Sequence, residues 1–377
     1  MRPGFQEVSR LLRQGVEAEC FPGAVLLVGY RGQLVYEAAL GNAACLPSAR
    51  AMTLDTVFDL ASLTKPIATA TALMLLVEAD MVGLDAPVAT YLAAYRHSNP
   101  GSPTLRQLLS HCSGLPAWRP YYRGIDPTWA PVDRRRAMYA AVHGERLLAR
   151  PGTTVQYSDA GFILLGELVE TVTGRPLDEF CRQEIFAALH LEGVGFRHLA
   201  PPPQAANMQF ASTESCHWRG RVLDGEVHDE NAWIMDGVSG HAGLFATGQQ
   251  VWRFAQGLLD ALHGGSWLVS TPTLRTFTTR QGIPEGSTWA LGWDTPTPGK
   301  SSAGRYFSPT AIGHLGFTGT SLWIDPTQRV IVVLLTNRIH PSRQREGIRA
   351  FRPLIHDAVM QALHKGGAEQ SVLSAEL

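Results

Sequence analysis

The stretch Asp59-Leu60-Ala61-Ser62-Leu63-Thr64-Lys65-Pro66 decides how this chain is interpreted. Ser62 and Lys65 stand three residues apart where an apolar helical pattern begins, and residues at this spacing are neighbours on one helix face. Lys65 can therefore reach the Ser62 hydroxyl, and a positioned base turns a weak serine nucleophile into a usable one. Because proline is tolerated only early in a helix, Pro66 predicts that the helix begins near Ser62. Taken alone, the pair is a weak signal and favours a capping serine beside an exposed lysine.

Two later segments place polar side chains next to predicted secondary structure. Gln156-Tyr157-Ser158-Asp159 directly precedes a predicted helix, and Gly313-His314-Leu315-Gly316-Phe317-Thr318-Gly319-Thr320 leads into a predicted strand. Each residue also has an ordinary structural interpretation: Tyr157 as a half-buried aromatic, Asp159 as an N-cap and His314 as a structural histidine. A site role for these residues rests on what the three segments resemble when taken together.

Together, the three segments resemble the motifs of the serine β-lactamase and penicillin-binding-protein superfamily. The resemblance is closest to its class C β-lactamase-like group, with its esterases and D-alanyl-D-alanine carboxypeptidases. In that group the motifs are serine-x-x-lysine, tyrosine-x-asparagine, and lysine-threonine-glycine or histidine-x-glycine. Residues 108–116, 240–247 and 291–293 carry the same resemblance, which covers roughly residues 20 to 360. It implies a serine hydrolase that works through an acyl-enzyme.

The resemblance assigns catalytic roles to four side chains. Ser62 would attack a carbonyl group, and Tyr157 would shuttle protons in acylation and in the attack by water. Lys65 would help to remove the serine proton, which requires part of its population to be neutral or a relay through Tyr157. Burial and neighbouring positive charge lower a lysine pKa in this way. His314 would orient Tyr157, or bind a substrate carboxylate when protonated.

The resemblance also implies three substrate-binding positions. The backbone N–H groups of Ser62 and Phe317 would hold the developing oxyanion. Gly316 has no side chain, so a substrate would lie close against its strand. Asp159 stands where asparagine is usual, and an acid there favours a charged Lys65 and cannot donate an amide hydrogen bond.

Two departures from the family pattern direct the choice of substrate. Asp159 replaces an amide, and His314, with an unperturbed pKa near 6.5, is a poorer fixed cation than lysine. Both weaken recognition of the carboxylate of β-lactams or peptidyl-D-alanine, so small esters or related acyl substrates are the leading prediction. β-Lactamase or D-alanyl-D-alanine carboxypeptidase activity is the alternative. An alternative of another class is a penicillin-binding or sensor protein that is acylated without turnover.

The expected fold is of the α/β class (α+β type) and β-lactamase-like. An antiparallel sheet flanked by helices carries an inserted, mostly helical lobe, with the active site between them. Residues 1–61 plus 191–377 are expected to form the sheet domain, and residues 62–190 the helical domain. Strands are predicted at 24–30, 34–39, 288–294, 319–325 and 329–337. Helices are predicted at 104–111, 134–148, 159–173, 176–189 and 346–365.

Composition describes an ordinary globular protein with a small-molecule substrate. The 377 residues include 45% hydrophobic and 17% charged residues, with a net charge of -1. There is no electrostatic case for nucleic-acid or anionic-membrane partners. The five scattered cysteines fit neither a disulfide framework nor a zinc site. We therefore expect no cofactor and no metal, and, with no signal peptide seen at the N-terminus, a cytoplasmic protein.

Several other features keep two interpretations open. Residues 228–231 with His241 suggest either a metal site or, more simply, a loop hydrogen-bond network, with a supporting role near the site also open. His111 is expected to brace its loop. The aromatic residues of the 118–131 loop either pack that loop or form an acyl-binding wall; they are Trp118, Tyr121, Tyr122 and Trp129.

An α/β-hydrolase would need a glycine-x-serine-x-glycine elbow between a strand and a helix. The segment Gly237-Val238-Ser239-Gly240-His241 fails this pattern at its last position. The rival enzyme class is therefore disfavoured.

Overall fold

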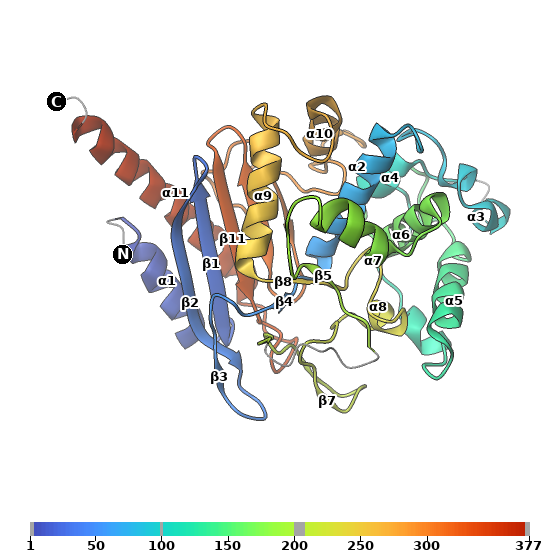
Figure 1. Ribbon diagram of the computed structural model, residues 1–377, viewed down its shortest axis with the longest axis horizontal. Helices are drawn as coiled ribbons and strands as arrows, with labels where there is room; N and C mark the ends of the chain where they lie inside the picture. The colour runs from blue at the N-terminus through green and yellow to red at the C-terminus, as the bar shows by residue number, and fades with distance from the viewer. Residues whose placement is uncertain (1–3, 99–100, 200–207, 374–377) are drawn as a thin grey trace.

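The computed structural model describes residues 4–98, 101–199 and 208–373. At its centre lies an antiparallel sheet of six strands (Figure 1). In spatial order these are β3 (Arg50–Ala51), β2 (Gln33–Ala44), β1 (Gly23–Tyr30), β11 (Val330–Thr336), β10 (Ser321–Asp325) and β9 (Ile312–Leu315). The first and last long strands of the chain are therefore neighbours, which confirms that the two ends of the chain share one sheet.

Alternation along the central strands gives the sheet two apolar faces. In β1, Ala24, Leu26 and Val28 belong to one buried cluster, whereas Val25 and Leu27 belong to another. Successive residues of a strand point to opposite faces, so a fully apolar strand needs cover on both sides. β1 and β11, which carry these buried runs, are consequently the two central strands of the sheet.

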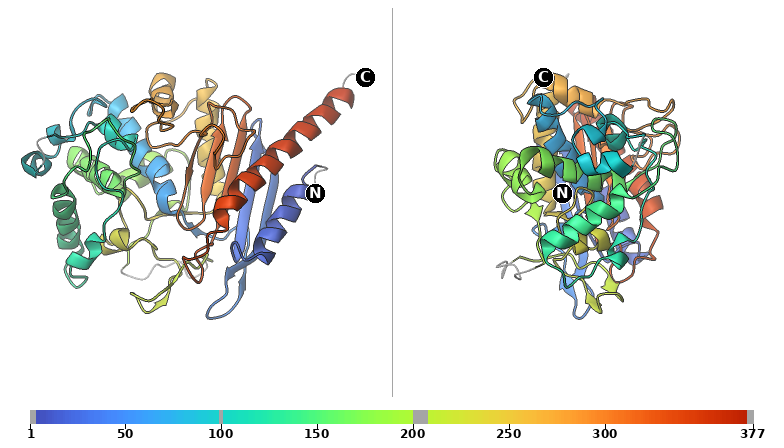
Figure 2. Two further views of the ribbon diagram at one scale, coloured as in Figure 1. Left: turned by 180° about the vertical axis from the view of Figure 1, so that it is seen from behind. Right: turned by 90° about the vertical axis from the view of Figure 1, so that its right-hand side faces the viewer.

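Helices supply that cover. α1 (Gln6–Glu17) and α11 (Ile348–Leu373) pack on one face, and α9 (Gly248–Leu262) packs on the other (Figures 1 and 2). The antiparallel sheet flanked by helices was predicted from the sequence and is confirmed. Within the described residues, no helix is long and apolar enough to cross a membrane.

A mostly helical region lies beyond α9, on the side away from α1 and α11 (Figure 1). Its α-helices are α2 (Thr71–Glu78), α3 (Ala93–Ser98), α4 (Leu105–Leu109), α5 (Pro131–His143), α6 (Asp159–Thr173) and α7 (Leu177–Phe180). Single turns of other helix types occur at Ala61–Leu63, Lys65–Ala70, Val88–Thr90, Tyr121–Gly124 and Cys181–Phe186. The division into two domains at residues 62 and 191 stays a prediction.

The remaining elements are short and frame the space between these two regions. They are β4 (Phe58–Asp59), β5 (Gly195–Phe196), β6 (Ser215–Cys216), β7 (Arg221–Val222), β8 (Leu244–Ala246), α8 (Glu230–Ile234) and α10 (Thr271–Thr278). β8 pairs with both β4 and β5, and so fixes the chain just before Ser62 against the segment that follows His241.

The sequence pattern misplaced one strand and several boundaries. The predicted strand at 288–294 is wrong: only Asp294 makes a bridge, to Gly313, because Gly292 takes a left-handed conformation (φ +81°) that breaks the extended chain. The helix predicted at 134–148 runs from Pro131 to His143, since proline favours the first helical turn and Gly144 follows its end. The third motif begins on β9, a strand that the pattern did not predict, and continues into the loop after it.

Candidate active site

A strained turn presents Ser62. Ala61, immediately before it, has a left-handed backbone (φ +48°), which is uncommon for a residue with a side chain. The conformation is held from both sides: the Asp59 carboxylate accepts a hydrogen bond from the Ala61 N–H at 2.8 Å, and the Thr64 hydroxyl donates to the Ala61 carbonyl at 2.6 Å. The turn leads straight into the helical chain that continues through α2, as the serine–lysine spacing predicted.

The loop after β9 is tied to this turn by two hydroxyl groups. Thr318 donates to the Asp59 carbonyl at 2.8 Å, and Thr320 donates to the Leu60 carbonyl at 3.0 Å. Both hydroxyls are buried, so these bonds are protected from water. Hydrogen bonds from these two threonine side chains to backbone carbonyls therefore fix the position of the third motif relative to Ser62.

Gly316 makes this close approach possible. A Cβ atom at this position would lie 2.6 Å from the Leu60 carbonyl oxygen and would overlap Thr320. We expect Gly316→Ala to lower the free energy of unfolding by about 1–3 kcal/mol, the usual cost of overpacking, and to impair reaction at Ser62. Thermal denaturation and the rate of fluorophosphonate labelling would measure the two effects. Gly195→Ala is the control because nothing lies within 4 Å of a Cβ there; equal effects of both variants would contradict the prediction.

Lys65 is fully buried and uses all three of its N–H donors. It donates to the Ser62 hydroxyl at 3.0 Å, to the Asp159 carboxylate at 2.7 Å and to the His241 carbonyl at 3.1 Å. Burial acts to lower the pKa of Lys65, but the Asp159 carboxylate and Tyr157 outweigh it and raise that pKa above its usual value. Lys65 is therefore an ammonium ion at neutral pH, as the acid at position 159 led us to expect.

Tyr157 is placed by the cap of α6. Ser158, and not Asp159, is the N-cap: its hydroxyl accepts the Gly161 N–H, which corrects the N-cap assignment made for Asp159. His111 accepts the Ser158 N–H at 3.1 Å and its ring packs against Tyr157, so it does brace the loop as expected. Burial raises the pKa of Tyr157, opposed by its interactions with Lys65 and with the Ser62 hydroxyl.

His314 is buried on β9 beside Tyr157. Its Nδ1–H donates to the Leu315 carbonyl at 2.9 Å, which leaves Nε2 as the unprotonated nitrogen of the neutral ring. Burial, with the Lys65 charge as a second cause, lowers the pKa of His314 to about 3. A protonated His314 that binds a carboxylate is therefore disfavoured near pH 7, because charging the ring would cost its desolvation beside an existing cation.

The segment 228–231 and His241 form a hydrogen-bond network next to the site. His241 Nε2 lies 2.8 Å from Asp229 Oδ1, and its Nδ1 lies 2.8 Å from the Ser239 hydroxyl. Ligand atoms of Asp159, Asp229 and His241 lie within 4.8 Å of one another, close enough for a metal ion. However, Asp159 already pairs with the Lys65 ammonium and Asp229 with His241, so a second cation would meet repulsion. We therefore assign the cluster to the loop network.

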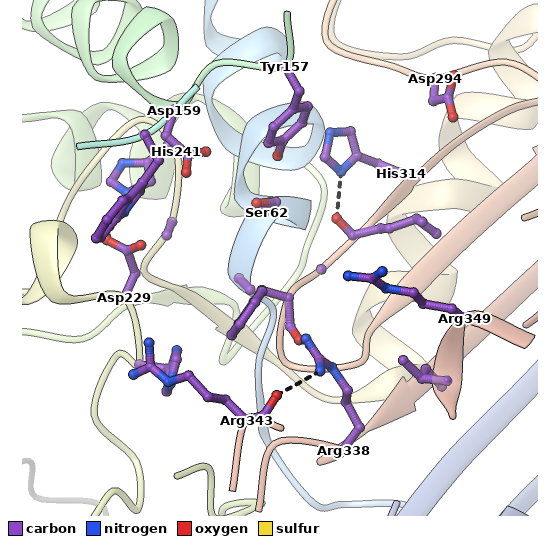
Figure 3. A pocket seen from close by; sticks show the side chains of 18 of the residues that line it. Ser62, Tyr157, Asp159, Asp229, His241, Asp294, His314, Arg338, Arg343 and Arg349 are labelled. Atoms are coloured by element: carbon purple, nitrogen blue, oxygen red, sulfur yellow. Dashed lines mark hydrogen bonds and ion pairs between the residues drawn. The ribbon is translucent and has the colours of Figure 1, made fainter. Parts of the chain in front are cut away.

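Ser62 opens into a pocket of about 640 Å³, a size typical of small-molecule sites. Figure 3 shows Tyr157 and Asp159 on one side of Ser62, and Arg338, Arg343 and Arg349 on the other. All seven residues proposed from the sequence lie at the site: six line the pocket and Lys65 lies beneath it. The six are Ser62, Tyr157, Asp159, His314, Gly316 and Phe317.

Sequence reasoning missed the positive wall of this pocket. Arg338, Arg343, Arg349 and Arg352 all line it, and all come from the segment after β11. Arg343 is neutralised by ion pairs with Glu214 and Glu230. Single arginines near the end of a chain have no motif of their own, so only their convergence in space reveals them.

Aromatic side chains form the other walls. Trp118 and Trp289 line the pocket, and Phe317 is 48% exposed there. Of the four aromatic residues in the 118–131 loop, Trp118 is the pocket-lining member among the described residues; Tyr122 is buried against Trp218 instead. Aromatic residues of this loop therefore both pack the loop and line the pocket, the two interpretations that the sequence left open.

Known proteins resemble this chain over most of its length. A family model described as Beta-lactamase matches residues 8–355. A protein of Escherichia coli O157:H7 named "Putative D-alanyl-D-alanine carboxypeptidase" is 33% identical over 89% of this chain and 82% of its own length. An N-acetylmuramyl-L-alanine amidase of Bacillus subtilis (strain 168) is 33% identical over 89% of this chain and 81% of its own.

Among solved structures, EstCE1, described as a hydrolase with promiscuous acyltransferase activity, superposes with a TM-score of 0.74. The superposition covers 95% of this chain and 98% of that one, at 22% identity. At this identity the likeness concerns the fold, which is the β-lactamase-like fold expected from the sequence.

Proposed function

The chain belongs to the Beta-lactamase family of serine hydrolases, and we propose that it hydrolyses small carboxylate-bearing amides or peptides through an acyl-Ser62 intermediate. The observation that carries this proposal is the pocket itself. The Ser62–Lys65 pair lies in its floor, and its wall includes Arg338 and Arg352, whose hydrogen bonds go to backbone carbonyls. Ser62 supplies the nucleophile, and Tyr157 carries a proton to the leaving group. The N–H groups of Ser62 and Phe317 bind the oxyanion.

The arginines supply the positive charge that His314 lacks. The Arg338 guanidinium donates to the backbone carbonyls of Phe317, Arg343 and Arg345, which carry no net charge to neutralise it. Burial and Arg338 lower the pKa of Arg352 to about 9, so it too is a cation at pH 7. Such groups favour a carboxylate in the substrate.

The two curated relatives are named for cleavage at D-alanyl-D-alanine and at N-acetylmuramyl-L-alanine. Both names describe substrates that contain an alanine, and cleavage in each case breaks an amide bond. We therefore propose that the substrates of this chain are amides or peptides that bear a carboxylate. The kinetic experiment below identifies which bond is cleaved.

Small esters, the leading prediction from the sequence, are the second candidate. Trp118, Trp289 and the half-exposed Phe317 offer apolar walls for an uncharged acyl chain. An ester also demands less of the catalytic groups, because its leaving group departs with less help from an acid.

Arg349 provides the test between these candidates. Its side chain is 77% exposed and is paired on the surface with Glu346, so its removal should leave the fold intact. We expect Arg349→Ala to raise the KM for a peptide ending in D-alanyl-D-alanine, or for N-acetylmuramyl-L-alanine, about tenfold. Hydrolysis of p-nitrophenyl butyrate should be nearly unchanged. Steady-state kinetics on the three substrates would measure this.

Arg345→Ala is the matched control, because Arg345 lies on the same segment but outside the set of pocket-lining residues. An equal rise in KM for the charged and uncharged substrates would contradict an anion-binding role. Wild-type protein that cleaves the ester far faster than either amide would favour the second candidate.

A further inference from the structure

The Lys65 ammonium cannot, as it stands, act as a base. An ammonium group offers three donors and no acceptor, and all three donors of Lys65 are engaged. It can take a proton from Ser62 only if it first gives one away. A neighbouring group must therefore accept that proton.

Tyr157 also interacts with Lys65, but burial raises the pKa of its hydroxyl, which therefore already carries its proton. Of the three acceptors that Lys65 contacts at 2.7–3.1 Å, one can take up a proton and become a stable neutral acid. The Ser62 hydroxyl is the group to be deprotonated, and the His241 acceptor is a backbone carbonyl. The third is the Asp159 carboxylate, which also makes the shortest of the three contacts at 2.7 Å. Asp159 is 17% exposed and lines the pocket, so the pair lies beside the reacting atoms.

We propose that Asp159 is the proton acceptor that lets Lys65 act as the base, so that Ser62, Lys65 and Asp159 form one proton relay. This rests on the proposed function, since it assumes that Ser62 is the nucleophile. The asparagine that family members carry at this position could not serve, because an amide does not hold a proton. The substitution thus changes the proton path and not only the charge of Lys65.

The protons balance in each half-reaction. In acylation Lys65 passes a proton to Asp159 and takes that of Ser62 as the serine Oγ–carbon bond forms. The leaving group departs with a proton through Tyr157, which Lys65 replenishes, and Asp159 returns its proton to Lys65. In deacylation water attacks the acyl carbon and loses a proton along the same path. The Ser62 ester bond then breaks, Lys65 returns a proton to Ser62, and Asp159 returns its proton to Lys65, which restores the ammonium–carboxylate pair.

The proposal predicts the direction in which Asp159→Asn shifts the pH dependence of acylation. In the wild type the reactive pair is ammonium and carboxylate, so acylation does not require Lys65 to lose its proton to solvent. In Asp159→Asn, Lys65 must itself be a free amine, and amines lose their proton at higher pH than carboxyls. The acid limb of the pH–rate profile is the range in which the labelling rate falls as the pH is lowered. In Asp159→Asn this limb should therefore move to higher pH by more than about one unit.

The competing mechanisms predict the opposite sign. Asp159 raises the pKa of both Lys65 and Tyr157, so its removal would lower either pKa. If neutral Lys65 or ionised Tyr157 were the wild-type base, the limb would move to lower pH. The titratable groups that face the pair are common to all variants; they are Tyr157, Tyr121, His111, His314, Asp229 and His241.

The experiment is the pH dependence of fluorophosphonate labelling, followed by intact mass spectrometry, for the wild type, Asp159→Asn and Asp159→Glu. An upward shift in Asp159→Asn and an acid limb retained in Asp159→Glu would support the relay. An unchanged limb or a downward shift would overturn it. Wild-type protein that is not labelled at Ser62 would instead overturn the proposed function.

Asp294 requires a control of its own, since burial raises the pKa of this pocket-lining carboxyl to about 6. Its Oδ1 accepts hydrogen bonds from Thr288 and Thr295, and neither bond involves Lys65. In an Asp294→Asn background, Asp159→Asn should still give the upward shift. Loss of the shift in that background would mean that Asp294 sets the limb, and would overturn the relay.

Discussion

Ser62→Ala is expected to abolish fluorophosphonate labelling and to lower turnover of p-nitrophenyl butyrate by at least about 10³-fold. The reason is covalent: alanine has no oxygen to form the acyl-enzyme, and the remaining groups offer only binding and oxyanion stabilisation. The loss should not come from misfolding, because Ser62 lies partly exposed in the pocket floor. Intact mass spectrometry and steady-state kinetics on both proteins would measure the two losses.

Ser239 is the control residue, because its hydroxyl lies 2.8 Å from His241 Nδ1 and this serine–histidine contact is the arrangement of an activated nucleophile. It is 2% exposed and buried behind the site, so Ser239→Ala should still be labelled at Ser62. Labelling that survives in Ser62→Ala would refute the assignment of the nucleophile. Wild-type labelling without turnover of any tested substrate would indicate the sensor alternative.

The serine–lysine pair was predictable because it is local. A three-residue spacing at the start of a helix brings Ser62 and Lys65 together whatever the rest of the chain does. Tyr157 and Gly316 were identified only through their resemblance to family motifs, since nothing in their own spacing says that they converge on Ser62. The contacts that bring them there, such as Thr320 to Leu60, join residues far apart in the chain.

The neutral state of His314 and the arginine wall were not predictable from the sequence. At position 314 a histidine with an ordinary pKa was expected, but burial on β9 lowers its pKa. For Lys65 the sequence named two opposing effects, burial and the acid at position 159, and the contact with Asp159 raises its pKa in the folded protein. Both outcomes depend on the balance between desolvation and one nearby charge, which is a property of the folded structure.

Lys65→Met is expected to slow labelling of Ser62 by at least about 10³-fold, since it removes the base together with the ammonium that orients the hydroxyl. It should also lower the free energy of unfolding, because Asp159 is left as a carboxylate without its cation. Complete burial of such a pair would cost about 3–5 kcal/mol, but Asp159 is 17% exposed, so about 1–3 kcal/mol is expected.

The double variant Lys65→Met/Asp159→Asn separates the two effects. Neutralising Asp159 removes the unpaired charge, so the double variant should recover most of the stability that Lys65→Met loses, and the cycle measures the pair directly. Reactivity should not recover, because neither remaining side chain can take the Ser62 proton. Thermal denaturation and labelling rates on all four proteins provide the cycle. A double variant that is both stable and reactive would show that Lys65 serves only to neutralise Asp159, and would leave Tyr157 as the base.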